Sequence, residues 1–331
     1  MTIRVARIVR LEGPEGLEIQ SEEPNEPAAG EVRVAMEALG LNRAEALMAR
    51  GEYLLTPELP ARIGIEGAGT ISATGEGVDA AVGDRVAVFC AAALDRYGTA
   101  ADEIVVPASL LFPNVPYLSS EELAAYWMAY LTAYGGMVQS GGLKEAEHVL
   151  VTAASSSVGL AAIDVAKRVG ATVTASTRRS EKAARLREAG ADHIALLGAD
   201  GIPEDAGPFN LVFDAIGGAF PGTLGSQLAP GARIVVYGIL AGEMHAAFPI
   251  FAAAEKDIRM TGFHLGYHLL ASEERRSDAF GWLAAAGAER PFAPAIDSTF
   301  ELADLADAYR ALEASQQVGK VVVRVDRRRQ S

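Results

Sequence analysis

The chain has 331 residues, half of them hydrophobic, and its 43 acidic residues outnumber the 29 basic ones, which gives a formal net charge of −14. This charge argues against nucleic acid or an anionic membrane surface as a partner, and the length corresponds to about two domains. The single cysteine, Cys90, excludes an internal disulfide and a multi-cysteine zinc site. No segment has the roughly 18 uncharged apolar residues of a membrane span, and the charged N-terminus is not typical of a signal peptide. We therefore expect a cytoplasmic protein.

Residues 1–115 contain short runs rich in β-forming residues, such as RVARIV, EVRVAMEAL and DRVAVF, which Gly and Pro separate. This pattern predicts a mostly antiparallel β domain. Residues 119–139, SSEELAAYWMAYLTAYGGMVQ, predict a helix with Ser119 or Ser120 as its N-cap.

Strands and helices alternate after this helix, beginning with the strand HVLVTA and the helix GLAAIDVAKRVG. About six strands follow this pattern, and several are almost entirely apolar, as in a sheet covered on both faces. The alternation predicts a doubly wound parallel sheet. The C-terminal segment adds an amphipathic helix at 301–315 and a strand at 319–325. A return of this strand to the β domain would make that domain discontinuous, and spacing alone does not settle this.

The turn after the first strand of the parallel sheet, residues 154–159, has the sequence ASSSVG where a dinucleotide site carries G-x-G-x-x-G. Small residues at the start of a helix let backbone N–H groups approach a pyrophosphate. Ala and Ser meet this size limit, and Gly159 permits close contact between helix and strand. We predict a dinucleotide site with Ser156, Ser157, Val158 and Gly159 at the pyrophosphate. A turn that is small only for packing is the alternative.

The end of the following strand has no acidic residue where an NAD site usually binds the ribose 2′-hydroxyl. Two arginines, two serines and a lysine lie in the segment ASTRRSEK, residues 175–182. Arginine makes forked contacts with phosphate. This predicts NADPH, with its 2′-phosphate held by Ser176, Arg178, Arg179 and Lys182. The alternative is a solvated helix start.

These stretches, with LNRAEALMARGEY, GIEGAGTISATGEGVDAAVGDRVAVF, FDAIGG and QQVGKVVVRV, resemble the medium-chain dehydrogenase/reductase superfamily, and more narrowly its zinc-independent quinone oxidoreductase branch. The resemblance covers nearly the whole chain. It implies an α/β fold, with a discontinuous GroES-like β-rich catalytic domain at 1–122 and 266–331 and a Rossmann NADPH-binding domain at 123–265. It also implies hydride transfer from NADPH, and a homodimer joined through the edge strand of the Rossmann sheet, for which residues 257–263 are the candidate.

The resemblance further implies a site without metal. Zinc-dependent members of the superfamily bind the metal through a Cys and a His-Glu pair, whereas this chain has Asn42, Ile65 and Glu66 at those positions. A catalytic zinc needs three protein ligands, and these residues do not supply them.

Quinones and α,β-unsaturated carbonyl compounds need little help from a Lewis acid, because their acceptor carbon is already electrophilic. Hydrogen-bond donors can stabilise the charge that develops on the oxygen. The resemblance implies that Asn42 faces the nicotinamide or the substrate carbonyl. It places Tyr53 in the substrate pocket, either as a donor or as a pocket wall.

Further cofactor positions follow from the same resemblance: Thr132, Ile216, Gly217, Tyr237, Gly238, Ile239, Phe263, His264, Leu265 and Lys320. Thr132 is expected at the nicotinamide end, unless its hydroxyl bonds to its own helix. Lys320 is expected either to reach the cofactor or to be a surface lysine. The tyrosine that many family members use near the adenosine phosphate is absent from residues 195–197.

The sequence therefore predicts a zinc-independent, NADPH-dependent reductase of quinones or activated alkenes. An enoyl-thioester reductase, a redox-silent NADPH-binding protein and a zinc-type alcohol dehydrogenase are the alternatives, in that order.

Overall fold

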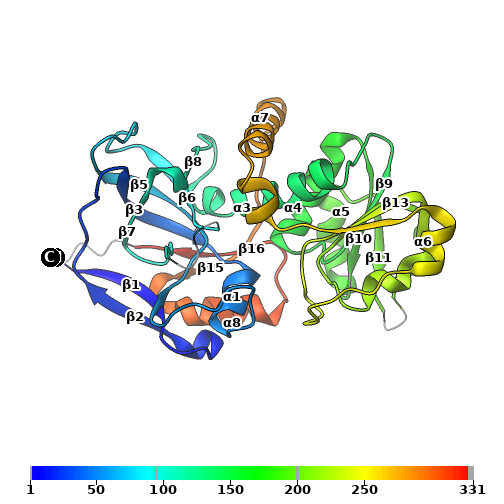
Figure 1. The fold of residues 1–331 in the computed structure, drawn as a ribbon, viewed down its shortest axis with the longest axis horizontal. Coiled ribbons are helices and arrows are strands. Elements are labelled where there is room, and N and C mark those ends of the chain that lie inside the picture. Colours follow the sequence, from blue (N-terminus) through cyan, green and yellow to red (C-terminus); the bar gives the residue numbers. More distant parts are fainter. Residues whose placement is uncertain (1, 92, 94–95, 199–200, 327–331) are drawn as a thin grey trace. The chain divides into compact units, whose positions relative to one another are not determined.

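The computed structural model describes residues 2–91, 93, 96–198 and 201–326 (Figure 1). The chain folds into two compact units. The first unit comprises residues 1–127 and 293–331, and the second comprises residues 128–292. The first unit is therefore discontinuous, with the second inserted into it.

The first unit is built from two sheets. The smaller has the strand order β2-β1-β4, and the larger has the order β15-β16-β3-β5-β6-β8, with β7 also paired to β3. The strands are β1 (Ile3–Ile8), β2 (Leu17–Glu22), β3 (Glu31–Gly40), β4 (Ala61–Arg62), β5 (Glu66–Thr74), β6 (Arg85–Phe89), β7 (Glu103–Pro107), β8 (Leu111–Phe112), β15 (Ile296–Glu301) and β16 (Lys320–Arg324). Its helices are α1 (Arg43–Ala49), α2 (Ser120–Ala124) and α8 (Leu305–Ala314). Most of these pairings are antiparallel, as the sequence predicts.

The last strand, β16, returns to the N-terminal β structure. It pairs antiparallel with β3, with Val322 opposite Gly40 and Val323 opposite Leu39, and parallel with β15. Helix α8 connects β15 to β16 and buries Leu305, Ala308, Tyr309 and Leu312. This spacing is that of an amphipathic helix with one apolar face. The return places Lys320 beside residues from the first 70 positions of the chain.

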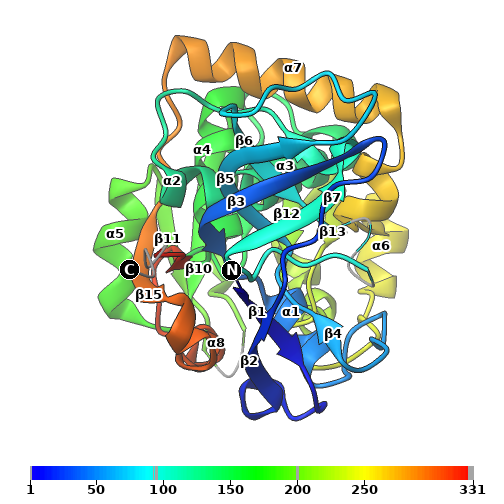
Figure 2. The ribbon, with the colours of Figure 1, turned by 90° about the vertical axis from the view of Figure 1, so that its left-hand side faces the viewer.

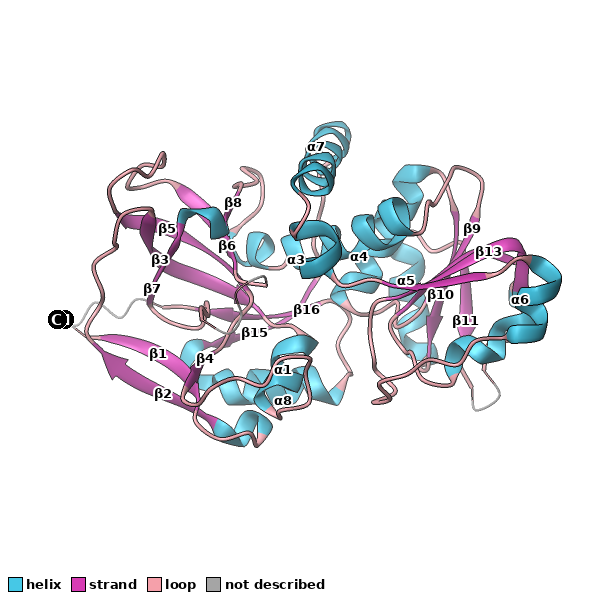
Figure 3. Cartoon of the chain, viewed as in Figure 1, coloured by secondary structure: helices cyan, strands magenta, loops and turns pink. Residues whose placement is uncertain are grey.

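The second unit contains a six-stranded, wholly parallel sheet with the order β11-β10-β9-β12-β13-β14. This is the Rossmann order, in which the chain winds outward from the centre in both directions. The strands are β9 (His148–Val151), β10 (Thr172–Thr177), β11 (His193–Leu196), β12 (Phe209–Asp214), β13 (Leu228–Val236) and β14 (Arg259–Gly262). The helices that accompany them are α4 (Ser157–Val169), α5 (Ala183–Glu188), α6 (Ile250–Lys256) and α7 (Glu273–Glu289). Figure 3 shows the sheet between α4 and α5 on one side and α6 on the other, so the predicted doubly wound sheet is confirmed.

The helix predicted at 119–139 is confirmed at its start and interrupted farther on. Ser119 caps α2, because its Oγ accepts from the N–H of Glu122 while the Glu122 carboxylate accepts from the N–H of Ser119. The chain then continues as α3 (Trp127–Ala133) and a π-helical segment at 134–140. A Cβ on Gly136 would lie 2.4 Å from Cε2 of Phe213, so the interrupted helix packs directly on β12.

The units divide at residues 127 and 293, whereas the expected domain boundaries are 122 and 265. The second difference has a clear cause, because α7 (orange in Figure 2) packs within the second unit. The ring of Tyr134 stacks on Trp282 at 4.7 Å, and its hydroxyl donates to Asp278 at 2.9 Å. Among the described residues, no helix is long and apolar enough to cross a bilayer.

Candidate functional site

In the second unit, the turn between β9 and α4 has the geometry of an anion-binding helix start. Ser156 is the N-cap of α4, and its Oγ accepts from the N–H of Gly159 at 3.0 Å. Ser157 and Val158 are the first residues of the helix. The N–H groups at these first positions have no acceptor within the helix and suit a phosphate.

The turn is also as tightly packed as the sequence predicts. A Cβ on Gly159 would lie 2.6 Å from the backbone O of Ala153 and 2.6 Å from Cα of Ala154. Ala154 in turn donates its N–H to the carbonyl of Ser176 at 3.2 Å. The end of β10 therefore lies directly beside the turn.

Two buried side chains hold the neighbouring strand ends together, and sequence reasoning missed both. Thr152 Oγ1 donates to Asp214 Oδ1 at 2.9 Å and accepts from the N–H of Ala215 at 2.7 Å. Asp214 also accepts from the N–H groups of Ile216 and Gly217, at 3.0 and 2.9 Å. Burial raises the pKa of the Asp214 carboxyl, and these hydrogen bonds oppose that shift. The available signal is a polar residue at the carboxyl end of each of two apolar strands.

The four residues predicted to hold the 2′-phosphate separate into two pairs. Lys182 is only 6% exposed, and its Nζ donates to Ser155 Oγ at 3.1 Å. Ser176 is also buried, and its Oγ has no hydrogen-bond partner in the part of the chain that the structure describes. Arg178 and Arg179 are exposed, which agrees with the alternative of a solvated helix start for these two side chains.

Five of the predicted cofactor residues gather at the same edge of the sheet. Tyr237 donates its N–H to the carbonyl of Asp214 at 2.8 Å. A Cβ on Gly238 would lie 2.7 Å from the backbone O of Ala215, so the segment that continues into Ile239 lies against the one that contains Ile216 and Gly217. Burial raises the pKa of the Tyr237 hydroxyl, and the nearby Asp214 carboxylate adds to this shift.

The residues after β14 continue this arrangement. Phe263 donates its N–H to the carbonyl of Val236 at 2.8 Å, and both Phe263 and Leu265 are buried. His264 Nδ1 accepts from the N–H of Tyr267 at 3.3 Å. Burial lowers the pKa of His264, and His268 nearby acts in the same direction.

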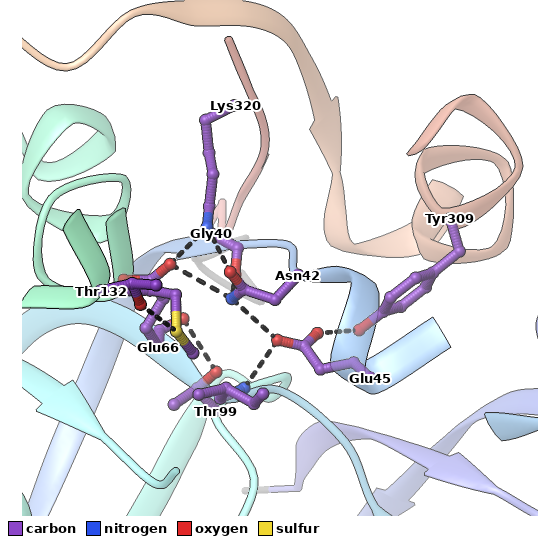
Figure 4. Close-up of polar contacts among 10 residues, drawn as sticks. Gly40, Asn42, Glu45, Glu66, Thr99, Thr132, Tyr309 and Lys320 are labelled. Atoms are coloured by element: carbon purple, nitrogen blue, oxygen red, sulfur yellow. Dashed lines mark hydrogen bonds and ion pairs between the residues drawn. The ribbon is translucent and has the colours of Figure 1, made fainter. Parts of the chain in front are cut away.

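Thr132 is buried on α3, and its Oγ1 lies 3.8 Å from the sulfur of Met128, one turn earlier (Figure 4). The hydroxyl thus contacts its own helix, although through a side chain and not through a carbonyl.

The first unit contains a separate polar cluster of Asn42, Glu45, Glu66, Tyr309 and Lys320, all buried (Figure 4). The Asn42 Nδ2 group lies 3.0 Å from the carbonyl of Gly40, 3.1 Å from Glu45 Oε1 and 3.2 Å from Glu66 Oε1. Lys320 Nζ donates to Asn42 Oδ1 at 2.6 Å and to Glu66 Oε1. The topology explains the cluster, since β3, β5 and β16 are neighbours or next neighbours in one sheet.

Lys320 is predicted either to contact the cofactor or to lie on the surface, and the surface alternative is wrong. Its side chain is 1% exposed and forms an ion pair with Glu66. No local pattern indicates this pair, because the two residues are 254 positions apart.

The other members complete the cluster. Glu45 accepts from the backbone N–H of Ile65 at 3.0 Å and from the hydroxyl of Tyr309. Burial raises the pKa of Glu45 to about 7, although its hydrogen bonds and the charge of Lys320 act in the opposite direction. The Thr99 hydroxyl donates to the backbone carbonyl of Glu66 at 3.1 Å.

Tyr53 lies in the segment between α1 and β4 and is half-buried. Cys90 is buried at the end of β6, and burial raises the pKa of its thiol to about 12. This environment does not favour a nucleophilic thiolate. Within the described ranges, no three His, Cys, Asp or Glu residues are grouped so that they could hold a metal ion.

Comparison with known proteins gives two family matches. Residues 28–117 match the alcohol dehydrogenase GroES-like domain, and residues 157–285 match the zinc-binding dehydrogenase family. The human synaptic vesicle membrane protein VAT-1 homolog is 31% identical over 321 residues, which cover 91% of this chain and 80% of that protein. The bovine quinone oxidoreductase-like protein 2 is 28% identical, over 97% of this chain and 92% of its own length.

Among solved structures, the quinone oxidoreductase of Thermus thermophilus, described with its NADPH complex, is 32% identical. Its superposition on this chain gives a TM-score of 0.82, and the match covers 97% of this chain and 99% of the Thermus chain.

Proposed function

Because the chain belongs to the medium-chain dehydrogenase/reductase superfamily, in its zinc-independent quinone oxidoreductase branch, we propose that it is an NADPH-dependent reductase that transfers hydride to a quinone or an α,β-unsaturated carbonyl compound. The observations that carry this proposal are the buried Lys182 ammonium, which donates to Ser155 of the turn, and the unpartnered Oγ of Ser176, whose carbonyl accepts from Ala154 of the same turn. A buried cation and a free hydroxyl at the end of β10 suit a 2′-phosphate.

The residues at this edge of the sheet fit NADPH in three respects. The start of α4 offers backbone N–H groups to a pyrophosphate. Gly159 leaves no space for a side chain between helix and turn, so the backbone is accessible to the phosphates. No carboxylate follows β10 directly, where it would repel a 2′-phosphate.

In this proposal the bound NADPH supplies the hydride, and the protein orients it and its acceptor. Lys182 and Ser176 hold the 2′-phosphate. Ser156, with the first residues of α4, holds the pyrophosphate. The Thr152–Asp214 pair fixes the strand ends that carry these groups and makes no direct contact with phosphate.

The substrate side involves Tyr53 and Asn42. All the amide N–H bonds of Asn42 are directed at acceptors of its own cluster. Negative charge develops on the substrate oxygen during hydride addition. The hydrogen bond to this oxygen is therefore assigned to the hydroxyl of Tyr53.

Steady-state oxidation of NADPH and NADH by the purified, metal-stripped chain tests the proposal, with a simple quinone and a simple enone as acceptors. We expect turnover with NADPH and a strong preference for it over NADH. In the K182M variant, the KM for NADPH should rise about 10- to 100-fold, since a hydrogen bond to a charged group contributes about 1.5–3 kcal/mol, while the KM for NADH should not change. K144M, which removes an exposed lysine of the same unit, is the matched control.

The absence of turnover with either acceptor would contradict the proposal. Reduction of a crotonyl thioester under the same conditions would then identify an enoyl-thioester reductase. Tight NADPH binding without any turnover would identify a redox-silent binding protein.

A further inference from the structure

An ammonium group is enclosed within the first unit. Lys320 is the first residue of β16 and has a 1% exposed side chain. A buried ion pair contributes little stability compared with apolar residues of the same volume, because both charges lose their hydration. Stability alone therefore gives a weak reason for a lysine at this position.

The contacts of Lys320 restrict the side chain of Asn42 to one orientation. The Asn42 oxygen faces the ammonium at 2.6 Å, and its nitrogen faces the carboxylates of Glu45 and Glu66 at 3.1 and 3.2 Å. If the amide were rotated by half a turn, its N–H groups would point at a cation and its oxygen at two acidic groups. The cation on one side and the acids on the other both oppose this rotation.

The stem of Lys320 lies close to the backbone of β3. A Cβ on Gly40 would lie 2.8 Å from Lys320 Cε and 2.0 Å from the backbone O of Ala124. Backbone and lysine stem therefore leave no space for a side chain at Gly40, and the lysine stem lies directly against β3.

We propose that Lys320 is a positioning residue for the reaction, whose ammonium fixes the Asn42 amide so that Asn42 presents a hydrogen-bond acceptor, and not a donor, to the cofactor or substrate. Only the second lone pair of the Asn42 oxygen is left for such a contact. The group that it binds must be an N–H or O–H donor, such as a carboxamide. This inference rests on the proposed function, in which Asn42 lies on the substrate side.

The orientation of Asn42 can be measured without turnover. The chain has four asparagines, so protein labelled with ¹⁵N-asparagine gives four side-chain amide signals, and an N42A variant assigns the signal of Asn42. We expect slow exchange of its amide protons with water in the wild type. In K320M/E66M, exchange should be faster by about tenfold or more, as expected when the hydrogen bonds that hold the amide are lost.

The double variant separates positioning from stability. K320M alone leaves Glu66 buried without its cation and should unfold at lower temperature, whereas K320M/E66M leaves neither charge unpaired and should recover most of this loss. We expect kcat to stay about 10- to 100-fold below that of the wild type in both variants, because a misplaced group can cost this much. The KM for NADPH should change little. R4M, which removes the Arg4–Asp102 ion pair of the same unit, should keep both kcat and the slow exchange.

If K320M/E66M regains wild-type kcat, or if its Asn42 amide exchanges as slowly as in the wild type, Lys320 is only structural and the inference is overturned. A wild-type chain that turns over no acceptor would instead overturn the proposed function, and the exchange rates would still show whether Lys320 orients Asn42.

Discussion

The Glu45 carboxyl should make the stability of the chain depend on pH below neutral, because it binds its proton more tightly in the folded chain than in the unfolded chain. It is fully buried, and the groups that face it are the Asn42 amide, the Ile65 N–H, the Tyr309 hydroxyl, the Lys320 ammonium and the Cys90 thiol. Burial raises its pKa from 4.5 to about 7. The unfolded chain therefore releases this proton at lower pH than the folded chain does.

The free energy of unfolding should fall between pH 4.5 and 7 because of Glu45. Below pH 4.5 the carboxyl is protonated in both states and its contribution is fully present; above pH 7 it is ionised in both, and the contribution is lost. The difference corresponds to about 3 kcal/mol. Urea unfolding of the wild type and of E45Q, which keeps an acceptor for the Ile65 N–H, measures it across pH 5–8. Parallel pH profiles for the two proteins would contradict this prediction.

The residues of the turn before α4 and those of the buried polar cluster were predictable to different degrees. Ser156, Gly159 and Lys182 lie within 30 positions of one another, so local motif spacing is enough to predict them as cofactor residues. The contact of Lys320 with Asn42 was not predictable, because it joins residues 278 positions apart and depends on the return of β16 to β3. Asp214 was overlooked, because a single acidic residue at a strand end has no motif of its own.

Helix α4 is the element on which the proposed cofactor site depends, and two glycines test its packing. G159A would place a Cβ 2.6 Å from backbone atoms, and such overpacking typically costs about 1–3 kcal/mol. Gly281, on α7, has no heavy atom within 4 Å of an added Cβ. G281A should therefore stabilise the chain by about 0.5–1 kcal/mol, as Ala does in an exposed helix.

Thermal unfolding measures the midpoints of G159A, G281A and the wild type, and titration with NADPH measures how tightly each binds the cofactor. G159A should have a lower midpoint and weaker NADPH binding, and G281A should have a higher midpoint and unchanged binding. Equal midpoints for the two variants would show that the turn before α4 can adjust to a side chain.

The alternation of apolar strands and amphipathic helices predicts the elements of the second unit well, because this pattern is local. It does not predict where a helix is interrupted. The break after α2 and the π-helical segment at 134–140 accompany close packing of Gly136 on Phe213 and of Gly135 on Phe263. Such contacts come from distant strands, so they have no signature in the helical segment itself.

At the scale of the whole chain, the order of the parallel sheet follows from its connections, whereas the boundary of the second unit does not. The segment 266–292 has the composition of an ordinary helix, and nothing in it identifies the unit against which it packs. Its contacts through Trp282 and Asp278 with Tyr134 decide this.

We predict that the chain forms a homodimer through β14. Among the described strands, β14 pairs only with β13 and lies at the edge of the sheet, so its other side offers free backbone donors and acceptors. On α6, just before this strand, Phe251 and Ile250 are 93% and 71% exposed, and exposed apolar groups of this size are typical of interfaces. A two-fold axis would bring two β14 strands together in antiparallel pairing.

Sedimentation equilibrium should therefore give twice the mass of the chain. F251D should shift the equilibrium toward monomer without lowering the unfolding midpoint of the monomer, because its side chain contacts mainly solvent in the single chain. V82D, at a 63% exposed valine of the first unit, should leave the mass unchanged. A wild-type protein that sediments as a monomer at every concentration would exclude the dimer. If F251D does not weaken the dimer, the interface is restricted to the edge strand itself, because strand pairing depends on the backbone and tolerates a charge on α6.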